Sequence, residues 1–491
     1  MRKIWSLSAI LSCLLISSSA FADGASDALL KLPFEAGMNH VKGNYAFTNN
    51  NYLVEGAEKI SSLGSPSIFI YMTNGYASDY PDKGQGLFGS PSNLTELASS
   101  AAYKEVFNLP FKMYVITVFT FANGSNIFRD QKSNADVYSD EYTEIYNLTK
   151  YLYATYAGTG KVFILKNWEG DWFAMRDTYD TSVSIPADNL ADVTNWLKAR
   201  QAAVAAARTA AGDPSDVAVL NATEVNRPSD YFNSGLNRLI NVVVPAVKAD
   251  MLTYSSYDTT IEGCGTDSAG ESGIKTCLGN MLTDMSKLAA DPLGLGTRRM
   301  LVSEYGLYEN NHSAADNLAR IEGVVSEAKS WGASGAMLWE LYDNQCTAAT
   351  KWSGGAVGSA APIAANTGAA GRPTNSTCPG LWYIRPDGST STAAQTMDAY
   401  WGTAATTVTV SAPAVDGTYS SPVTVKATCT SSSAIDHLSV WVDGVKLGNV
   451  TGATVDQSYA MSSTGSHVLG VQCVQASGTV LGATDVDFTS K

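Results

Sequence analysis

The feature that most restricts the fold is an eightfold alternation of short apolar runs and longer helical patterns between about residues 32 and 401. Each run is short, β-branched and almost continuously apolar, as in parallel strands that are buried on both faces. Helical periodicity fills the intervals, most clearly over 142–156, 189–211 and 314–331. The predicted strands are 34–39, 67–73, 112–119, 161–166, 217–222, 250–255, 299–303 and 335–339.

Eight such units predict an α/β fold of the (β/α)8 barrel type. This fold typically needs about 250 residues and tolerates insertions, so the stretch of about 370 residues can accommodate it. The alternative is a doubly wound open sheet. No predicted strand is followed by GxGxxG or a P-loop, the motifs that would favour that alternative.

The pattern changes after Trp401 to strict alternation of apolar and polar residues. Over 423–429 and again over 469–473 the apolar positions share one parity, which predicts half-buried strands with Cys429 and Cys473 pointing inward. Trp441 has the opposite parity to its apolar neighbours, so we expect it to face away from the core. Residues 404–491 therefore predict a small antiparallel β-sandwich, which is similar to a bacterial immunoglobulin-like module.

The first 22 residues have the organisation of a secretory signal peptide. Arg2 and Lys3 precede an apolar stretch over 4–16, and Ala20-Phe21-Ala22 offers a cleavage site between small residues. A membrane anchor is the alternative, but the apolar stretch is short for crossing about 30 Å of hydrocarbon. We expect a signal peptide over 1–22, a barrel domain over 23–403, a sandwich over 404–491, and a secreted or periplasmic protein.

Six cysteines remain once the predicted leader is removed, and an even number in an exported chain favours disulfides. Several pairings are possible for six cysteines, and pairing of consecutive cysteines is the simplest. The predicted disulfides are Cys264 with Cys277, Cys346 with Cys378, and Cys429 with Cys473.

Composition excludes several classes of ligand. The net charge of −14 and the lack of a basic cluster argue against nucleic acid or an anionic membrane as partner. Only 16% of the residues are charged, while 24 Tyr and 10 Trp are present, which suits a neutral ligand rich in hydroxyl groups. The chain has no CxxC, HExxH or GxSxG motif. We therefore expect no metal, no cofactor and no transmembrane segment, and a monomer.

Two of the predicted strands are followed at once by a glutamate. Glu169 comes after the fourth strand and Glu304 after the seventh. Catalytic side chains of (β/α)8 enzymes project from the carboxyl ends of the strands, so both carboxylates should enter one mouth. Glycoside hydrolysis requires such a pair, one protonated and one ionised.

Other residues at the strand ends suit a sugar. Aromatic rings stack on pyranose faces, and amides bind hydroxyl groups. Asp171 either raises the pKa of Glu169 by like charge or binds substrate, and Glu224 is either a substrate contact or an alternative catalyst. The predicted substrate-binding residues are Asn39, Asn167, Trp168, Asp171, Trp172, Glu224, Tyr254, Tyr257, Tyr305 and Trp339.

Three short motifs resemble those of the clan A glycoside hydrolases, a group of retaining (β/α)8 enzymes. They are Asn-Trp-Glu at 167–169, Ser-Glu-Tyr-Gly at 303–306, and Trp339 at the end of the eighth run. In that group the asparagine usually directly precedes the acid/base glutamate, whereas Trp168 intervenes here.

This resemblance implies that Glu169 is the acid/base and Glu304 the nucleophile. It also implies that Asn167 contacts the sugar 2-hydroxyl, that Tyr254 or Tyr257 hydrogen-bonds the nucleophile, and that Trp339 forms the floor of the glycosyl subsite. We therefore expect a secreted retaining glycosidase that acts on a poly- or oligosaccharide, with endo action. The alternative is a non-catalytic carbohydrate-binding or cell-surface protein that uses the same aromatic mouth.

Overall fold

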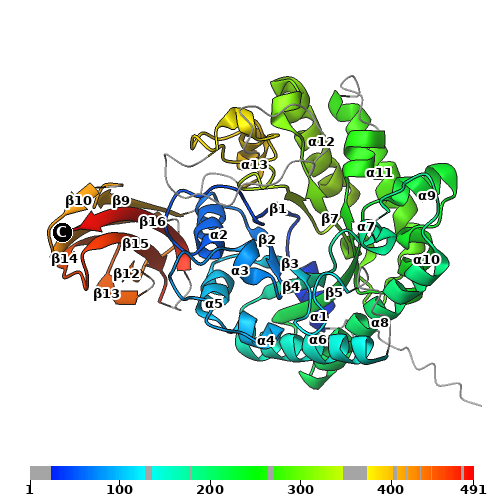
Figure 1. Cartoon of the computed structure of the whole chain (residues 1–491), viewed down its shortest axis with the longest axis horizontal. Helices are drawn as coiled ribbons and strands as arrows, with labels where there is room; N and C mark the ends of the chain where they lie inside the picture. Colours follow the sequence, from blue (N-terminus) through cyan, green and yellow to red (C-terminus); the bar gives the residue numbers. More distant parts are fainter. Residues whose placement is uncertain are drawn as a thin grey trace, which may run out of the picture.

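The chain folds into a helix-covered barrel and a separate β-sandwich, drawn at the two ends of Figure 1. The structure is a computed structural model. Residues 1–23, and with them the predicted signal peptide, lie outside the described residues. The described residues are 24–127, 135–176, 178–263, 270–346, 373–401, 406–415, 417–431, 433–443, 445–476 and 480–491. Among them, no helix combines the length and the apolar character needed to cross a bilayer.

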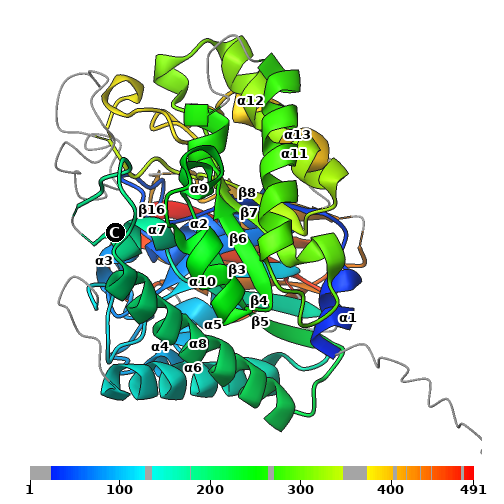
Figure 2. The same cartoon turned by 90° about the vertical axis from the view of Figure 1, so that its right-hand side faces the viewer.

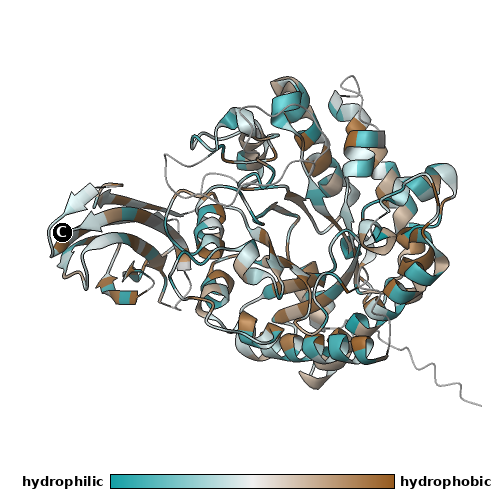
Figure 3. Ribbon diagram, in the orientation of Figure 1, coloured by the Kyte–Doolittle hydropathy of each residue, from teal (hydrophilic) through white to brown (hydrophobic). Residues whose placement is uncertain are grey.

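Eight parallel strands close into a barrel in the order in which they follow along the chain, which confirms the predicted (β/α)8 fold and excludes the open sheet. Every strand residue of this barrel is buried, and Figure 3 shows the brown, hydrophobic residues concentrated there. β5 extends three residues beyond the predicted strand and so includes Glu224. The strands are β1 Glu35–Asn39, β2 Ser67–Met72, β3 Met113–Val118, β4 Lys161–Lys166, β5 Val217–Val225, β6 Met251–Ser255, β7 Met300–Tyr305 and β8 Gly335–Leu338.

Helices surround the barrel, as Figures 1 and 2 show from two directions. α12 illustrates how the sequence sets their ends. Ser313 accepts a hydrogen bond from the Asp316 N–H at the first turn, and Gly332 ends the helix in the left-handed conformation. The α-helices are α1 Gly24–Leu30, α2 Tyr52–Ser62, α3 Tyr76–Asp79, α4 Leu94–Ala98, α5 Ala101–Asn108, α6 Ala135–Tyr156, α7 Gly170–Met175, α8 Ala187–Ala210, α9 Pro228–Ser234, α10 Leu239–Val247, α11 Gly270–Leu288, α12 Ala314–Trp331 and α13 Ala393–Trp401.

The C-terminal strands form two packed sheets, in the orders β10-β16-β15-β12-β13 and β14-β11-β9. The disulfide between Cys429 on β11 and Cys473 on β15 joins the two sheets, with 6.1 Å between the Cα atoms, as predicted. The strands are β9 Thr406–Ala412, β10 Gly417–Tyr419, β11 Val423–Ser431, β12 His437–Val442, β13 Val445–Thr451, β14 Thr454–Tyr459, β15 Gly465–Val474 and β16 Val480–Ser490.

The other predicted disulfides concern the barrel domain. Cys346 and Cys378 are bonded, which ties together the ends of the long segment after β8. Cys277 is also disulfide-bonded, but its predicted partner, Cys264, lies outside the described residues.

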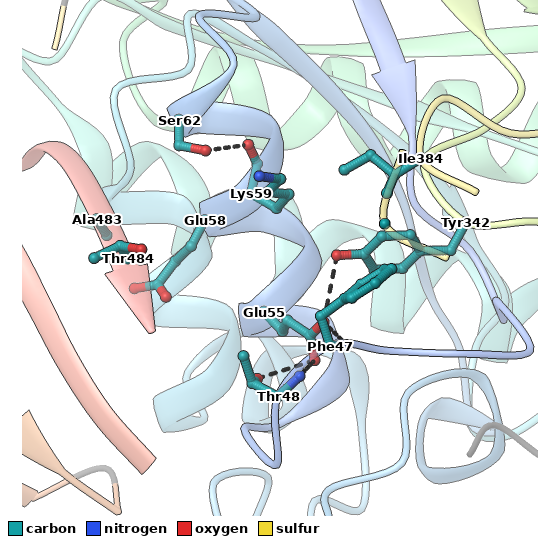
Figure 4. Close-up of a pocket in the computed structure, with 11 residues that line it drawn as sticks. Phe47, Thr48, Glu55, Glu58, Lys59, Ser62, Tyr342, Ile384, Ala483 and Thr484 are labelled. Carbon is teal, nitrogen blue, oxygen red and sulfur yellow. Dashed lines mark hydrogen bonds between the residues drawn. The ribbon is translucent and has the colours of Figure 1, made fainter. Parts of the chain in front are cut away.

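The sandwich contacts the barrel along a polar seam in which β16 packs against α2. Asn49 donates hydrogen bonds to Asp487 through its backbone N–H, at 3.0 Å, and its side-chain amide, at 3.1 Å. Figure 4 shows a cavity of about 250 Å³ in this seam, lined by the barrel and by β16. Trp441 is half-buried and lines a smaller gap of the same seam, so its ring faces the barrel and not the sandwich core.

Candidate active site

Glu169 lies three residues beyond the end of β4 and is half-buried. It directly precedes α7, and its carbonyl accepts a hydrogen bond from the Phe173 N–H in the first turn. Its own backbone N–H donates to Oε1 of Glu224 at 3.0 Å. The backbone of Glu169 is thus fixed while its carboxyl group stays available for a ligand.

Gly170 allows α7 to begin against the end of β5. A Cβ atom at this position would lie 2.2 Å from Cδ2 of Leu239 and 2.4 Å from the backbone oxygen of Glu224. Neither distance is compatible with normal van der Waals contact, and the second atom belongs to a barrel strand that cannot yield easily. The close approach of α7 to β5 therefore requires glycine.

We expect Gly170→Ala to lower the free energy of unfolding by about 2 kcal/mol, because the added methyl group overpacks this junction. It should also lower turnover, since Glu169 would be displaced with α7. Urea unfolding and assays of the same samples measure both effects. Gly448→Ala is the matched control, because a Cβ atom there meets nothing within 4 Å. Equal stability of the two variants would contradict this account.

Glu304 enters the same mouth from β7. Neighbouring residues of a regular strand point to opposite faces, yet Ser303 and Glu304 both reach the same cluster. The register of β7 shifts against both β6 and β8 at this point, and such irregularities re-aim side chains. Glu304 is 3% exposed, and its Oε1 has no hydrogen-bond partner among the described residues.

A third carboxylate, Glu224 of β5, lies between the two and is fully buried. Ser303 donates to its Oε2 at 2.7 Å and Ser255 to its Oε1 at 3.2 Å. It forms an ion pair with Lys166, the last residue of β4, whose Nζ is also 3.8 Å from Oε1 of Glu304. The structure thus brings Glu224 and Glu304 to one ammonium group, with the backbone of Glu169 bonded to Glu224.

The electrostatics of the cluster favour retention of a proton. Burial, followed by the charge of Glu224, raises the pKa of Glu169 to about 8, and Asp171 contributes in the same direction. Burial, Glu224 and Glu169 also raise the pKa of Glu304, whereas Lys166 lowers it. The pKa values of both glutamates are thus raised, and Lys166 is the neighbouring charge that favours the ionised form of Glu304.

Three of the predicted substrate-binding residues form hydrogen bonds within the protein. Asn39 is buried and donates to the carbonyl of Leu338 at 3.1 Å. Asn167 is buried as well and accepts from the Glu224 N–H at 2.8 Å. Asp171 is buried and accepts from three backbone N–H groups, those of Asn226, Arg227 and Leu239. In this structure these side chains hold the loops beyond the strands in place.

The predicted aromatic residues divide into two groups. Trp168, Trp172 and Tyr257 are partly exposed. Tyr254 and Tyr305 are buried in the protein. Trp339 belongs to the buried group, with 8% of its surface exposed.

The two tyrosines considered as partners of the nucleophile differ in their contacts. The hydroxyl group of Tyr254 bonds with Asp258 and Thr259. After burial, the charges of Glu304 and Glu169 are the main causes that raise the pKa of Tyr257. The hydroxyl group of Tyr254 is thus bonded elsewhere, whereas Tyr257 lies within the electrostatic influence of both glutamates.

The sequence reasoning did not identify Lys166. Its signal was nevertheless present, because a lysine ends an otherwise apolar strand at the same parity as Val162 and Ile164. A charged side chain at an inward position of a buried strand needs a partner of opposite charge nearby. Ser255 was missed as well, and no pattern in the sequence marks it.

Comparisons with known proteins agree with this two-part architecture. Residues 407–471 match the family model for a bacterial Ig domain. No curated protein matched the chain. The sandwich therefore carries a bacterial immunoglobulin-like domain, as predicted.

Solved structures similar to the chain include glycoside hydrolases. A β-glucuronidase 2 from Bacteroides uniformis has 11% identity and a TM-score of 0.42, over 93% of this chain and 46% of that one. An endo-β-1,4-mannanase from Thermotoga petrophila has 14% identity and a TM-score of 0.40, over 94% and 99%. A modular endo-β-1,4-mannanase from Cellulomonas fimi has 12% identity and a TM-score of 0.37, over 96% and 99%. The chain spans about half the length of the glucuronidase.

Proposed function

We propose that this protein is a retaining glycoside hydrolase, with Glu169 as the acid/base and Glu304 as the nucleophile. The observation that carries the proposal is the placement of these two glutamates at the ends of β4 and β7 against one buried ion pair. Glu304 lies 3.8 Å from the ammonium group of Lys166, and the backbone N–H of Glu169 donates to Glu224. The raised pKa of Glu169, about 8, supports its role as the acid.

In the first step an oxygen of Glu304 attacks the anomeric carbon while the proton of Glu169 moves to the glycosidic oxygen. The bond between the anomeric carbon and the leaving group breaks, and a glycosyl-enzyme ester forms. In the second step water gives a proton to Glu169 and its oxygen displaces Glu304 from the sugar. Both glutamates then return to their starting state.

The proposed substrate is a poly- or oligosaccharide, bound in the mouth by Trp168, Trp172, Tyr257 and Trp339. The partly exposed rings support this choice, because aromatic faces stack on sugar rings. We also propose endo action and export of the chain by its first 22 residues, with domains over 23–403 and 404–491. The two disulfides and the bacterial Ig domain support an extracellular or periplasmic location.

The test is a screen of the purified protein against a panel of polysaccharides, with the products sized and their anomeric configuration followed by NMR. We expect short oligosaccharides that first appear with the anomeric configuration of the substrate. Products of inverted configuration would contradict a nucleophilic Glu304, because inversion requires carboxyl groups about 6.5–9.5 Å apart instead of about 5–5.5 Å. Binding of a glycan without any product would favour a non-catalytic carbohydrate-binding protein.

A further inference from the structure

Lys166 is a fully buried lysine at the centre of the carboxylate cluster. Its ammonium group pairs with Glu224, lies 3.8 Å from Oε1 of Glu304, and is 4.2 Å from the ring centroid of Phe69. Burial of a charged amine is costly unless it is paired. Lys166 therefore holds its place through the carboxylates that surround it.

Glu224 is likewise held by contacts within the protein. Besides Lys166, donors from three other elements reach its two oxygens: Ser303, Ser255 and the backbone N–H of Glu169. Thr253 adds a further contact at 3.3 Å. Both oxygens of Glu224 are therefore taken up by contacts within the protein, and its side chain is fully buried.

We propose that the Lys166–Glu224 ion pair is the positioning element of the site, which keeps the negative charge on Glu304 and the proton on Glu169. This inference rests on the proposed function and deepens it. Neither residue of the pair touches the sugar. The pair acts through the two glutamates that do.

The charge count gives the reason. The Lys166–Glu224 pair carries no net charge, but its cation and its anion act on different neighbours. The ammonium group lies near Glu304, and the carboxylate of Glu224 accepts from the backbone N–H of Glu169. Glu304 lies beside the lysine, whereas Glu169 lies at the half-open mouth, where the fixed charge of Glu224 opposes its ionisation. Further titratable groups among the described residues interact electrostatically with the two glutamates, and all of them are tyrosines or carboxyl groups: Tyr71, Asp171, Tyr257, Asp258, Tyr308 and Glu340.

The two members of the pair should act in opposite directions on the pH dependence of hydrolysis. Lys166→Met removes the cation that favours ionised carboxylates, so both limbs of the bell-shaped profile should move to higher pH. Glu224→Gln removes the repelling charge, so both limbs should move to lower pH. We expect shifts of about one pH unit or more, because charges about 4 Å apart in a protein interact by several kcal/mol.

A merely structural role would lower activity in both variants without opposite shifts. Lys161→Met is the matched control, because Lys161 is a buried lysine at the other end of β4 and donates to the carbonyls of Leu109 and Phe111. It should reduce stability and leave the pH profile unchanged. Shifts in the same direction, or no shift, for Lys166→Met and Glu224→Gln would overturn the proposal.

Lys166→Met alone leaves Glu224 buried without its cation and can fail to fold. The double variant Lys166→Met/Glu224→Gln removes both charges, and its profile should return towards that of the native protein. Infrared titration of the protonated carboxyl band provides a readout that needs no substrate. If the native protein hydrolyses no glycan, the proposed function fails; opposite infrared shifts would still support the role of the pair, and their absence would overturn it.

Discussion

Replacement of Glu304 by glutamine should reduce hydrolysis on the order of 10⁴-fold, while the protein remains folded. The amide is nearly isosteric with the carboxylate but cannot attack the anomeric carbon, so the glycosyl-enzyme ester cannot form. Glu169→Gln should also greatly reduce the rate of hydrolysis. The reduction should be largest for substrates with poor leaving groups, because these depend most on protonation by Glu169. Initial rates and circular dichroism of the same samples measure activity and folding.

The two glutamates can be told apart by azide, a small anionic nucleophile. In Glu169→Ala, azide should attack the ester on Glu304 and give a glycosyl azide with the configuration of the substrate. In Glu304→Ala, azide should occupy the space of the lost carboxylate and give the opposite configuration. If Glu169→Ala gave the opposite configuration and Glu304→Ala gave that of the substrate, the roles of Glu169 and Glu304 would be reversed. Full activity of either glutamine variant would show that the replaced glutamate is not catalytic.

The second large effect concerns Glu35, at the opposite end of the barrel from the mouth. It begins β1 and is fully buried, and neither of its carboxylate oxygens has a hydrogen-bond partner among the described residues. Burial raises the pKa of Glu35 to about 7, although Arg298 and Lys112 act in the opposite direction. The folded protein therefore holds a proton there that the unfolded chain releases near pH 4.5.

The sign of the effect follows from this difference. A raised pKa in the folded state means that the protonated acid favours folding at low pH. Stability should then fall as the pH rises from about 4.5 through about 7, by about 3 kcal/mol. Glu35→Gln has no proton to lose at this position, so its stability should fall with pH by about 3 kcal/mol less than that of the native protein and exceed it at pH 8.

Urea unfolding at several pH values between about 5 and 8 measures this difference. Glu322→Gln, which changes an exposed glutamate of α12, is the control and should follow the native protein. Parallel curves for the native protein and Glu35→Gln would show that Glu35 does not carry the pH dependence.

The barrel could be predicted from the sequence because its strands are buried on both faces and its helices have clear ends. β4 and α12 have the predicted bounds. The two glutamates could be named for the same reason, since Glu169 lies three residues beyond β4 and Glu304 is the last residue but one of β7. Alternation alone could not reveal that Ser303 and Glu304 point into one cluster, because the register shift of β7 depends on its neighbours.

The tertiary partners of polar residues were also beyond the reach of the sequence. Asn167 and Asp171 were expected to bind substrate, but the structure uses both to fix backbone groups. The residue type indicates that a side chain can form hydrogen bonds, but it does not reveal the partner of those bonds. The orientation of Trp441 was predicted correctly as outward from the sandwich, whereas the barrel surface that receives it belongs to a different domain.

The polar seam has a consequence for how such a chain can change over evolution. Asn49 and Asp487 meet outside both hydrophobic cores, and so do Glu105 and Gln472, which are 3.0 Å apart. Val474 of β15 is the described sandwich residue that packs into the barrel core, so exchange of the C-terminal module for another would alter that contact and the polar ones. Replacement of the C-terminal domain at this seam would also change the orientation of the barrel mouth relative to that domain.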